Sequence, residues 1–306
     1  MSWVVGLETG SIRQGLREIT AEEVGHIQQV VGRFRQLSRQ ELARTLCEHL
    51  QWYSPSGALK VKNCLKLLER LADADMIVLP KKLPGGRLTP DKPPALTDRT
   101  AARPLIKGPL KAYQPIELIA VTAKAQQALW NEYVERYHPL GYRRPFGNWL
   151  RYLLSADGEP LGCLLISGAA KALHHRDQWL GWRVAQRRRN LPWVINNSRY
   201  LIFPWVDIPH LASHALGQLA RRVATDWEAR WGYRPVLMET FVDPAHHAGT
   251  CYQAAGWQLL GMTRGNGISR PGKHYTTSPK RILVKPLDDQ FRELLCSEQL
   301  QGRIIE

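Results

Sequence analysis

The chain has 306 residues, of which 44% are hydrophobic, so it is long enough for one large domain plus a small one. Its 42 Lys and Arg outnumber its 27 Asp and Glu, which gives a formal charge of +15 at pH 7. This excess excludes an average enzyme of neutral metabolites and favours a polyanionic partner, since basic surfaces attract nucleic acid. Charge by itself does not separate DNA from RNA or from an anionic membrane.

The chain contains no run of about 18 apolar residues, and its first 20 residues lack the apolar core of a signal peptide. We therefore expect a cytoplasmic protein that does not enter a membrane. The cysteines are scattered, odd in number and never spaced as C-x-x-C, so neither a disulfide framework nor a zinc ribbon is indicated. They are Cys47, Cys64, Cys163, Cys251 and Cys296.

The N-terminal part predicts three helices. Residues 21–37 carry apolar side chains at steps of three and four, which is typical of an amphipathic helix. Ser38 and Glu41 have the S-x-x-E spacing of a capping box, so a second helix is expected to begin there. That helix ends at the turn signal 54–57, and a third helix is expected over roughly 59–74.

The run 76–79 predicts a strand and 81–87 a basic loop, so together with the helices they indicate a winged helix-turn-helix. A helical bundle whose lysines only solvate it is the alternative. In the winged helix-turn-helix, polar and basic side chains of the third helix and of the loop contact DNA. They are Lys60, Lys62, Asn63, Lys66, Arg70, Lys81, Lys82 and Arg87.

Eight prolines in residues 80–115 argue against a helix or a central strand, so we expect a semi-rigid basic linker there. The expected domains are a helical winged helix-turn-helix over 1–79, the linker over 80–115, and an α/β domain that processes DNA over 116–306.

Beyond the linker, 122–137 predicts a helix, and 149–155 with 161–167 predicts a hairpin around Asp157-Gly158. The elements expected next are a strand at 200–203, a long helix at 211–230, a buried strand at 235–242, a short helix at 249–255 and a strand at 257–262. The expected fold class is therefore α+β, a winged helix-turn-helix followed by a mixed α/β sheet.

This order of elements, with the runs 239–243 and 249–257, resembles the last part of the N-acetyltransferase (GNAT) fold. Acetyltransferases place a glycine-rich turn before the long helix, where backbone amides hold the pyrophosphate of acetyl-CoA. Here residues 205–213 contain no glycine, and Asp207 would repel phosphate. A GNAT-like sheet used for another task is therefore favoured over acetyl transfer.

Several words of the sequence, in order, resemble the family of the Druantia anti-phage system protein DruA, whose members include transposase-like proteins of bacterial mobile elements. The words are LSRQELAR (37–44) with QW (51–52), HPLGY (138–142), RDQWLGW (176–182), NSRYLI (197–202), LASH (211–214), ETFVD (239–243) and GTCYQAAGW (249–257). The family has tyrosine where this chain has Pro139, so no role of that tyrosine carries over. The resemblance implies a DNA-directed role in phage defence or transposition.

Three carboxylates, Asp177, Glu239 and Asp243, are candidates for catalysis and for metal binding. Glu239 and Asp243 are four residues apart around the end of a buried strand, where site residues gather in α/β sheets. With Asp177 they would hold Mg²⁺, the implied cofactor, for cleavage or transfer of a DNA strand. Solvated or arginine-paired carboxylates are the alternative.

Tyr252 is a candidate nucleophile or general acid, and a tyrosine that only packs is the alternative. His138 is a further catalytic candidate, as a histidine that can act near a phosphate. His210 and His214 have the i, i+4 spacing of a zinc motif, but the glutamate of H-E-x-x-H is absent, so a zinc site is not favoured.

A second DNA-contact surface is expected in the C-terminal domain, because arginine forks bind phosphate bidentately and glycine lets the backbone approach it. A solvated run of charges is the alternative. The surface comprises Arg183, Arg187, Arg188, Arg189, Arg264, Arg270, Lys273, Lys280 and Arg281.

The leading hypothesis is a DNA-processing enzyme of transposase or nuclease type, in a mobile element or in anti-phage defence. Its expected partners are DNA and either a second copy of the chain or other proteins of the same system, with no membrane. A non-catalytic DNA-binding module in defence is the alternative, and an acetyl-CoA-dependent N-acetyltransferase is a third.

Overall fold

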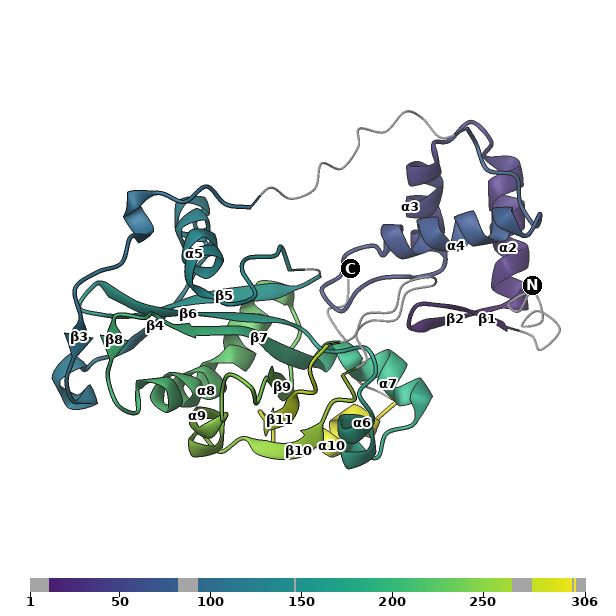
Figure 1. Ribbon diagram of the computed structural model, residues 1–306. Helices are drawn as coiled ribbons and strands as arrows, with labels where there is room; N and C mark the ends of the chain where they lie inside the picture. Colours follow the sequence, from purple (N-terminus) through teal and green to yellow (C-terminus); the bar gives the residue numbers. More distant parts are fainter. Residues whose placement is uncertain (1–10, 82–92, 146, 266–276, 299, 301–306) are drawn as a thin grey trace. The chain divides into compact units, whose positions relative to one another are not determined.

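The computed structural model describes residues 11–81, 93–145, 147–265, 277–298 and 300 (Figure 1). The chain divides into two compact units, whose described residues are 11–81 in unit 1 and 93–300, with the gaps given above, in unit 2. Among the described helices, none is both long and apolar enough to span a bilayer. All five cysteines are described, and each is a free thiol, as expected.

The described part of unit 1 begins with a β-hairpin that the sequence analysis did not predict. Strand β1 (Ser11–Gln14) pairs antiparallel with β2 (Arg17–Thr20), and the turn between them uses Gly15 at a positive φ of 63°. The next elements are α2 (Ala21–Arg33), α3 (Arg39–His49) and α4 (Val61–Asp73). The three predicted helices are therefore confirmed, although the first ends four residues before the predicted Leu37.

Capping boxes determine where α2 and α3 begin. The Ser38 hydroxyl accepts from the Glu41 amide, and the Glu41 carboxylate accepts from the Ser38 amide. Thr20 and Glu23 make the same reciprocal pair at the start of α2. Each box satisfies two backbone donors that the helix itself leaves without partners.

One hydrophobic core joins the hairpin to the three helices. Buried side chains come from every element of unit 1, which explains why the hairpin and helices fold together. The core includes Ile12, Ile19, Val24, Ile27, Ala43, Leu46, Cys64, Leu67, Leu68 and Leu71.

The strand predicted at 76–79 is wrong, because these residues form no ladder with another strand and only Ile77 among them is buried. The loop predicted at 81–87 lies outside the described residues except for Lys81. The sheet in the described part of unit 1 is therefore the β1–β2 hairpin, which precedes α2, and not a strand after α4 as predicted.

The predicted linker is wrong in its second half, because residues 97–113 fold onto unit 2. Strand β3 (Ile106–Lys107) pairs parallel with β8 (Val206–Asp207), between the short 3₁₀ helices η1 (Asp98–Thr100) and η2 (Leu110–Tyr113). Thr100 Oγ1 donates to the buried Glu132 carboxylate over 2.6 Å. The prolines of residues 97–113 limit the length of these elements, but the segment is packed and does not act as a linker.

In the described part of unit 2, seven strands form one mixed sheet (Figure 1). In their order across the sheet they are β10 (Gln258–Met262), β11 (Arg281–Pro286), β9 (Leu237–Val242), β7 (Val194–Ile202), β6 (Glu159–Gly168), β5 (Trp149–Ala156) and β4 (Glu117–Ala120). The β7–β9 pair is parallel and the other pairs are antiparallel. The predicted order of hairpin, strand, long helix, strand, short helix and strand is confirmed.

Helices cover both faces of the sheet, with α5 (Lys124–Tyr137) on one face and α8 (Leu211–Trp231) with α9 (Thr250–Ala254) on the other (Figure 1). On the α5 face, Trp130 is buried and its indole donates to the Tyr152 carbonyl over 2.9 Å. On the other face, the Tyr152 hydroxyl donates to Asp226 of α8 over 2.8 Å. Alternation along β5 therefore decides which residues face each helix layer.

Strand β7 was predicted, but it begins at Val194 rather than at residue 200. The remaining elements of unit 2 were not predicted from the sequence. The additional helices are α6 (His174–Leu180), α7 (Val184–Asn190), the 3₁₀ turn η3 (Leu191–Trp193) and α10 (Phe291–Cys296). Strands β4 and β11 were also missed, because neither short run carries a clear alternation.

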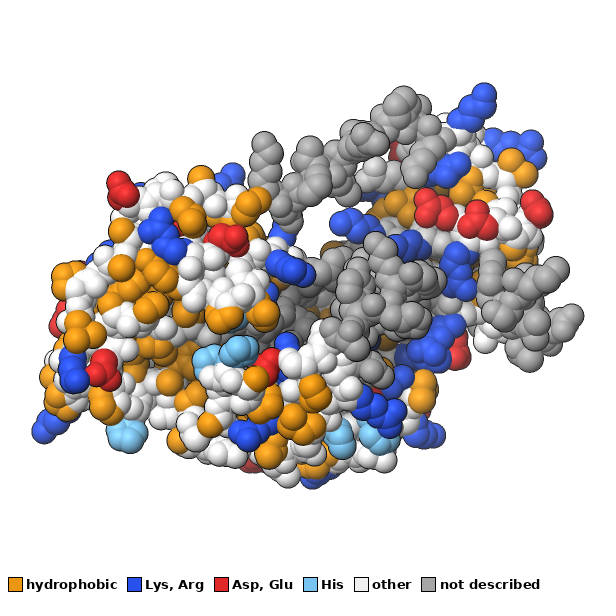
Figure 2. All heavy atoms as spheres, in the orientation of Figure 1, with side chains coloured by type: hydrophobic (Ala, Val, Ile, Leu, Met, Phe, Trp, Pro, Cys, Tyr) orange, Lys and Arg blue, Asp and Glu red, His pale blue; other side chains and the backbone are white. Residues whose placement is uncertain are grey.

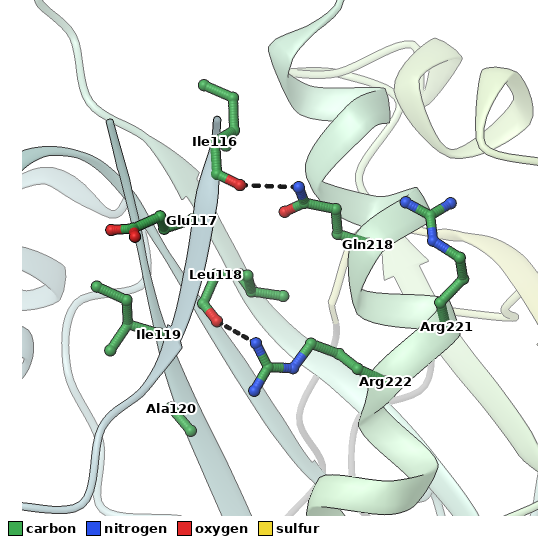
Figure 3. Close-up of a pocket in the computed structure, with 8 residues that line it drawn as sticks. All are labelled: Ile116, Glu117, Leu118, Ile119, Ala120, Gln218, Arg221 and Arg222. Atoms are coloured by element: carbon green, nitrogen blue, oxygen red, sulfur yellow. Dashed lines mark hydrogen bonds between the residues drawn. The ribbon is translucent and has the colours of Figure 1, made fainter. Parts of the chain in front are cut away.

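The edge strand β4 is covered by side chains of α8 (Figure 3). Gln218 donates to the Ile116 carbonyl over 2.8 Å, and Arg222 donates to the Leu118 carbonyl. A hollow of about 610 Å³ lies between the strand and the helix, beside Arg221. These bonds satisfy carbonyls that an uncovered edge would offer to another chain.

The capping box of α3 gives a stability prediction. Ser38→Ala removes the acceptor of the Glu41 amide, so we expect the free energy of unfolding to fall by about 1 kcal/mol. Urea unfolding followed by circular dichroism measures it. Gln40→Ala, at an exposed position of the same helix, is the control and should leave the midpoint within error. Equal midpoints for both variants would contradict the role of the box.

Candidate functional site

The predicted carboxylate Glu239 lies in the middle of β9 and is completely buried. Its Oε2 accepts from Arg176 Nη1 over 2.8 Å, and its Oε1 accepts from the Ala170 amide over 2.7 Å. Arg176, on α6, is completely buried as well. Burial raises the pKa of Glu239, and the adjacent Arg176 guanidinium opposes this rise.

Asp177 joins the same network from α6. Its Oδ1 accepts from Arg176 Nη2 over 2.8 Å, and its Oδ2 accepts from Arg187 Nη1 of α7 over 2.8 Å. Burial alone would raise the pKa of Asp177, but the ion pair with Arg176 and the bond from Arg187 bring it below its usual value. The Trp182 ring lies 5.4 Å from the Arg176 guanidinium carbon, so the arginine is enclosed by carboxylates and an aromatic face.

Asp243 lies just beyond the end of β9 and belongs to a different arrangement. One of its oxygens accepts from the Ala245 amide over 3.1 Å, and the other from the Ser278 hydroxyl. The Ser278 bond is the main reason why the pKa of Asp243 is below its usual value. Asp243 therefore organises the loop after β9 rather than facing Arg176.

The structure does not bring together the three carboxylates that were predicted to hold Mg²⁺, and the metal site itself stays a prediction. The arginine side chains and backbone amides already take the oxygens of Glu239 and Asp177, and their positive charge opposes a cation. Among the described residues, no group of three or more His, Cys, Asp or Glu side chains is placed to hold a metal ion. The arrangement instead matches the alternative of arginine-paired carboxylates.

The predicted nucleophile Tyr252 is buried on α9, with its ring edge-on to Trp257 at 5.1 Å. Its hydroxyl accepts from Asn197 Nδ2 over 3.3 Å and lies 3.5 Å from the Thr240 hydroxyl. Burial raises the pKa of the Tyr252 phenol, so the nucleophilic phenolate is disfavoured at neutral pH. This geometry favours the packing role that was weighed as the alternative.

His138 ends α5 and begins the turn 138–142. Its Nδ1 accepts from the Leu140 amide over 3.1 Å, which requires an unprotonated nitrogen. Burial, with the nearby Arg199 and His247, lowers the pKa of His138 to about 4. The imidazole is therefore neutral at physiological pH.

On α4, the predicted DNA-contact residues have different environments. Lys62 and Lys66 are exposed. Lys60 is half-buried, and burial lowers its pKa. Arg70 Nη1 donates over 2.7 Å to the Arg13 carbonyl and over 2.7 Å to Gln14 Oε1, so Arg70 ties α4 to the hairpin. Asn63 is half-buried beside Gly15.

The arginines at 183–189 pair with carboxylates of neighbouring segments, Arg187 in a mostly buried pair and Arg183 and Arg189 at the surface. Arg187 pairs with Asp177, while Arg183 and Arg189 both pair with Glu298, over 3.3 and 3.8 Å. Asn190 Nδ2 donates over 2.9 Å to the Leu295 carbonyl. Arg187 is therefore held in an ion pair and Arg188 is half-buried, and the expectation that this run contacts DNA stays a prediction.

In the segment 264–281, Arg264 is exposed, Lys280 is half-buried and Arg281 donates to the Ala248 carbonyl. Arg270 and Lys273 lie outside the described residues, as do Lys82 and Arg87. On the face of the molecule in Figure 2, Lys and Arg side chains are scattered over the described surface of both units and outnumber Asp and Glu. The basic surface is thus dispersed on this face.

A hollow of about 490 Å³ lies beside the carboxylate–arginine network, between α6 and α7. Asp177, Trp182 and Arg187 line it, so the network has one side open to a ligand-sized space. The wall of this hollow carries both positive and negative side chains, and its carboxylate, Asp177, is already paired with Arg187.

Sequence reasoning missed the two cations around the turn 138–142. Arg151 on β5 donates to the Tyr142 hydroxyl over 3.3 Å, and Arg199 on β7 donates to the Gly141 carbonyl over 3.3 Å. The turn is held from α5, since Glu135 accepts from the Tyr142 amide over 2.7 Å. The HPLGY motif pointed to the turn in the sequence. The two arginines lie beside it only because of the register of β5 and β7, which the sequence does not show.

The profile of the family described as Druantia protein DruA matches residues 96–295. The match covers well over half of the chain and begins beside the segment that packs on Glu132, within the predicted linker. No curated protein matches the chain.

Solved structures similar to the chain include N-acetyltransferases. The ribosomal-protein-S18-alanine N-acetyltransferase from Escherichia coli is 10% identical, with a TM-score of 0.33 over 56% of this chain and 94% of that one. An aminoglycoside acetyltransferase in complex with coenzyme A is 18% identical, with a TM-score of 0.35 over 58% and 97%. The N-acyl amino acid synthase FeeM from uncultured soil microbes is 12% identical, with a TM-score of 0.32 over 56% and 91%. TM-scores this low say nothing about activity.

The buried ion pair gives a second stability prediction. Glu239→Ala leaves Arg176 buried without its main partner, so we expect the free energy of unfolding to fall by about 3 kcal/mol or more. The control is Glu228→Ala, which removes a half-exposed partner of Arg234 and should cost less than about 1 kcal/mol. Chemical denaturation measures both. A Glu239→Ala protein as stable as its parent would show that the pair is not structural.

His138 gives a pH prediction. Its pKa is about 4 when folded and 6.5 ordinarily, so the unfolded chain binds more protons between these values. The stability it contributes is complete above pH 6.5 and is lost as the pH falls toward 4. We expect His138→Gln to flatten the fall of the melting midpoint over this range. His174→Gln, at an exposed position, should keep the parent's profile, and two identical profiles would oppose the assignment.

Proposed function

Because the chain belongs to the Druantia protein DruA family, we propose that it is a DNA-binding protein of an anti-phage defence system. The charge of +15 supports this proposal, since cation excess gives affinity for a phosphate backbone. In this role the protein acts with DNA and with other proteins of the same system.

The observation that carries the proposal is the pair Lys62 and Lys66 on the exposed face of α4. The two lysines are one helical turn apart, while Leu67 and Leu71 on the opposite side are buried in the core of unit 1. A helix divided in this way can lie in the major groove with its lysines at the phosphates. Helix α3 would then be the first helix of the helix-turn-helix.

The wing is part of the same proposal. Lys81 is exposed at the end of the described part of unit 1, and Lys82 and Arg87 follow it in the sequence. A basic loop after the recognition helix reaches an adjacent groove or the backbone in winged proteins. In unit 2, the exposed Arg264 is proposed to make a further phosphate contact.

We do not extend the proposal to strand cleavage or transfer by Asp177, Glu239 and Asp243. Glu239 accepts from Arg176 at one oxygen and from a backbone amide at the other, so a metal would first have to break a buried ion pair. Acetyl transfer is not favoured either, because residues 205–213 contain no glycine and the Asp207 carboxylate would repel a pyrophosphate.

The test is the affinity for a fluorescent 30-base-pair duplex in an anisotropy titration across a series of salt concentrations. Replacing Lys62 and Lys66 by Ala removes two proposed phosphate contacts, so we expect affinity to fall about tenfold and the salt slope to decrease by about 2. The chain's shape should not change, since neither lysine is buried.

The control is the double variant Arg33→Ala and Arg35→Ala, which removes the same charge from exposed positions at the end of α2. If both double variants weaken binding equally, the contact is non-specific and α4 is not the reading helix. Plasmid incubated with the parent protein and Mg²⁺ should stay intact, and nicking that Glu239→Gln abolishes would restore the enzyme hypothesis.

A further inference from the structure

Unit 2 contains two kinds of buried arginine, and the contrast between them is informative. Arg176 is completely buried and lies against Glu239 and Asp177, whose charges keep its pKa above the usual value against the effect of burial. Arg151 is only 5% exposed, yet no carboxylate pairs with it among the described residues. Its Nε has no hydrogen-bond partner.

The surroundings of Arg151 are aromatic and cationic. Its guanidinium carbon lies 5.4 Å from the Trp130 ring and 5.7 Å from the Trp149 ring. The hydrogen bond from its Nη2 goes to the Tyr142 hydroxyl. Burial lowers the pKa of Arg151, the Tyr142 hydroxyl partly opposes this, and the nearby Arg144 lowers the pKa further. A charge in such a place is costly unless an anion joins it.

Arg199 lies on the same face of the sheet as Arg151. Both residues are in register with Leu165 of β6, one from β5 and the other from β7, so their side chains point toward the α5 layer. Two strand spacings put their backbones about 10 Å apart, which long arginine side chains can span around one anion. The hydrogen bonds of Arg199 go to the carbonyl oxygens of Gly141 and Ser198.

The turn 138–142 lies at this pair and adds further nitrogen groups. Arg143 lies close enough to Arg199 to lower its pKa, after the larger effect of burial. His138 is near both Arg199 and His247. The nearby carboxylate of Glu135, on α5, accepts from the Tyr142 amide, which holds the turn in place. The cluster therefore combines several cations with one carboxylate that serves the backbone.

We propose that Arg151 and Arg199, with the Tyr142 hydroxyl, form a binding site for a phosphate group in unit 2. Guanidinium groups bind phosphate bidentately, and the unused Nε of Arg151 supplies a donor to such a fork. The inference deepens the proposed DNA-binding function, on which its biological meaning rests, by naming the group that unit 2 holds. Its chemistry is testable without DNA.

The experiment measures the melting midpoint of the full chain in sodium phosphate and in sodium chloride at matched ionic strength. With phosphate at ten times its Kd, we expect the midpoint to rise by about 3 °C above that in chloride. Arg151→Met keeps much of the side-chain volume and removes the charge, so the phosphate shift should disappear while the protein stays folded in chloride. Arg199→Gln should reduce the phosphate shift by at least half.

Arg230→Met is the matched control, since Arg230 lies 5.0 Å over Trp231 on α8 without belonging to the cluster. This variant should keep the full phosphate shift. No difference between phosphate and chloride in the parent, or an equal shift in Arg151→Met, overturns the site. If Arg151→Met does not fold, Arg199→Gln decides between these outcomes.

Short thymidine oligonucleotides with and without a 5′-phosphate separate the sources of the group. Tighter binding of the phosphorylated strand, lost in Arg151→Met, assigns the site to strand ends. Equal binding of both strands, weakened about tenfold in Arg151→Met, assigns it to the backbone. A response to inorganic phosphate alone would keep the site and remove its link to DNA, whereas the Lys62 and Lys66 variants test the DNA-binding proposal separately.

Discussion

The buried pair between Arg176 and Glu239 is the interaction on which the second half of unit 2 depends. It fastens α6 to the centre of the sheet, and Asp177 extends the connection to α7 through Arg187. Asn190, at the end of α7, then donates to the carbonyls of Leu295 in α10 and of Ser297 just after it. Burying a charge is costly, so each side chain in this series of contacts depends on the others. Together they hold α6, α7 and α10 against one another.

The same network decides what Glu239 can do. A carboxylate at the middle of a buried strand is an attractive catalytic candidate, since its burial raises the pKa. Structural ion pairs perturb pKa values as well, and here the partner is an arginine that is itself fully buried. Arginines therefore tie Glu239 and Asp177 into the fold, and the cations that have no carboxylate partner are the candidates for binding an anion.

In this protein some arginines stabilise the fold through internal contacts and others have no carboxylate partner. This division explains how a charge of +15 is compatible with a packed fold. Some arginines are used internally: Arg70 ties α4 to the hairpin, and Arg222 ties α8 to β4. Others, such as Arg151, are buried without a carboxylate, and exposed lysines cover α4. Among the described residues the buried charged side chains are Arg151, Arg176, Glu132 and Glu239, two of each sign, so burial leaves the cationic excess at the surface.

Much of the architecture follows from the sequence alone, because it depends on local periodicity and on turn chemistry. The S-x-x-E word places the start of α3, and Asp157-Gly158 places the β5–β6 hairpin, since both act over a few residues. The order of elements from that hairpin to β10 was predicted for the same reason. The DruA resemblance rests on short sequence motifs, which can be recognised without a structure.

Only the tertiary structure decided the environment of each charged side chain. Arg176 and Glu239 are 63 residues apart in sequence, and Arg151 and Arg199 lie on the same face of the sheet only through the register of three strands. Nothing local distinguishes a paired arginine from an unpaired one, so Arg187 was assigned to DNA and Arg151 was overlooked. Electrostatic partners are set by long-range packing, and burial turns the same charge into a structural bond or into a site for an external anion.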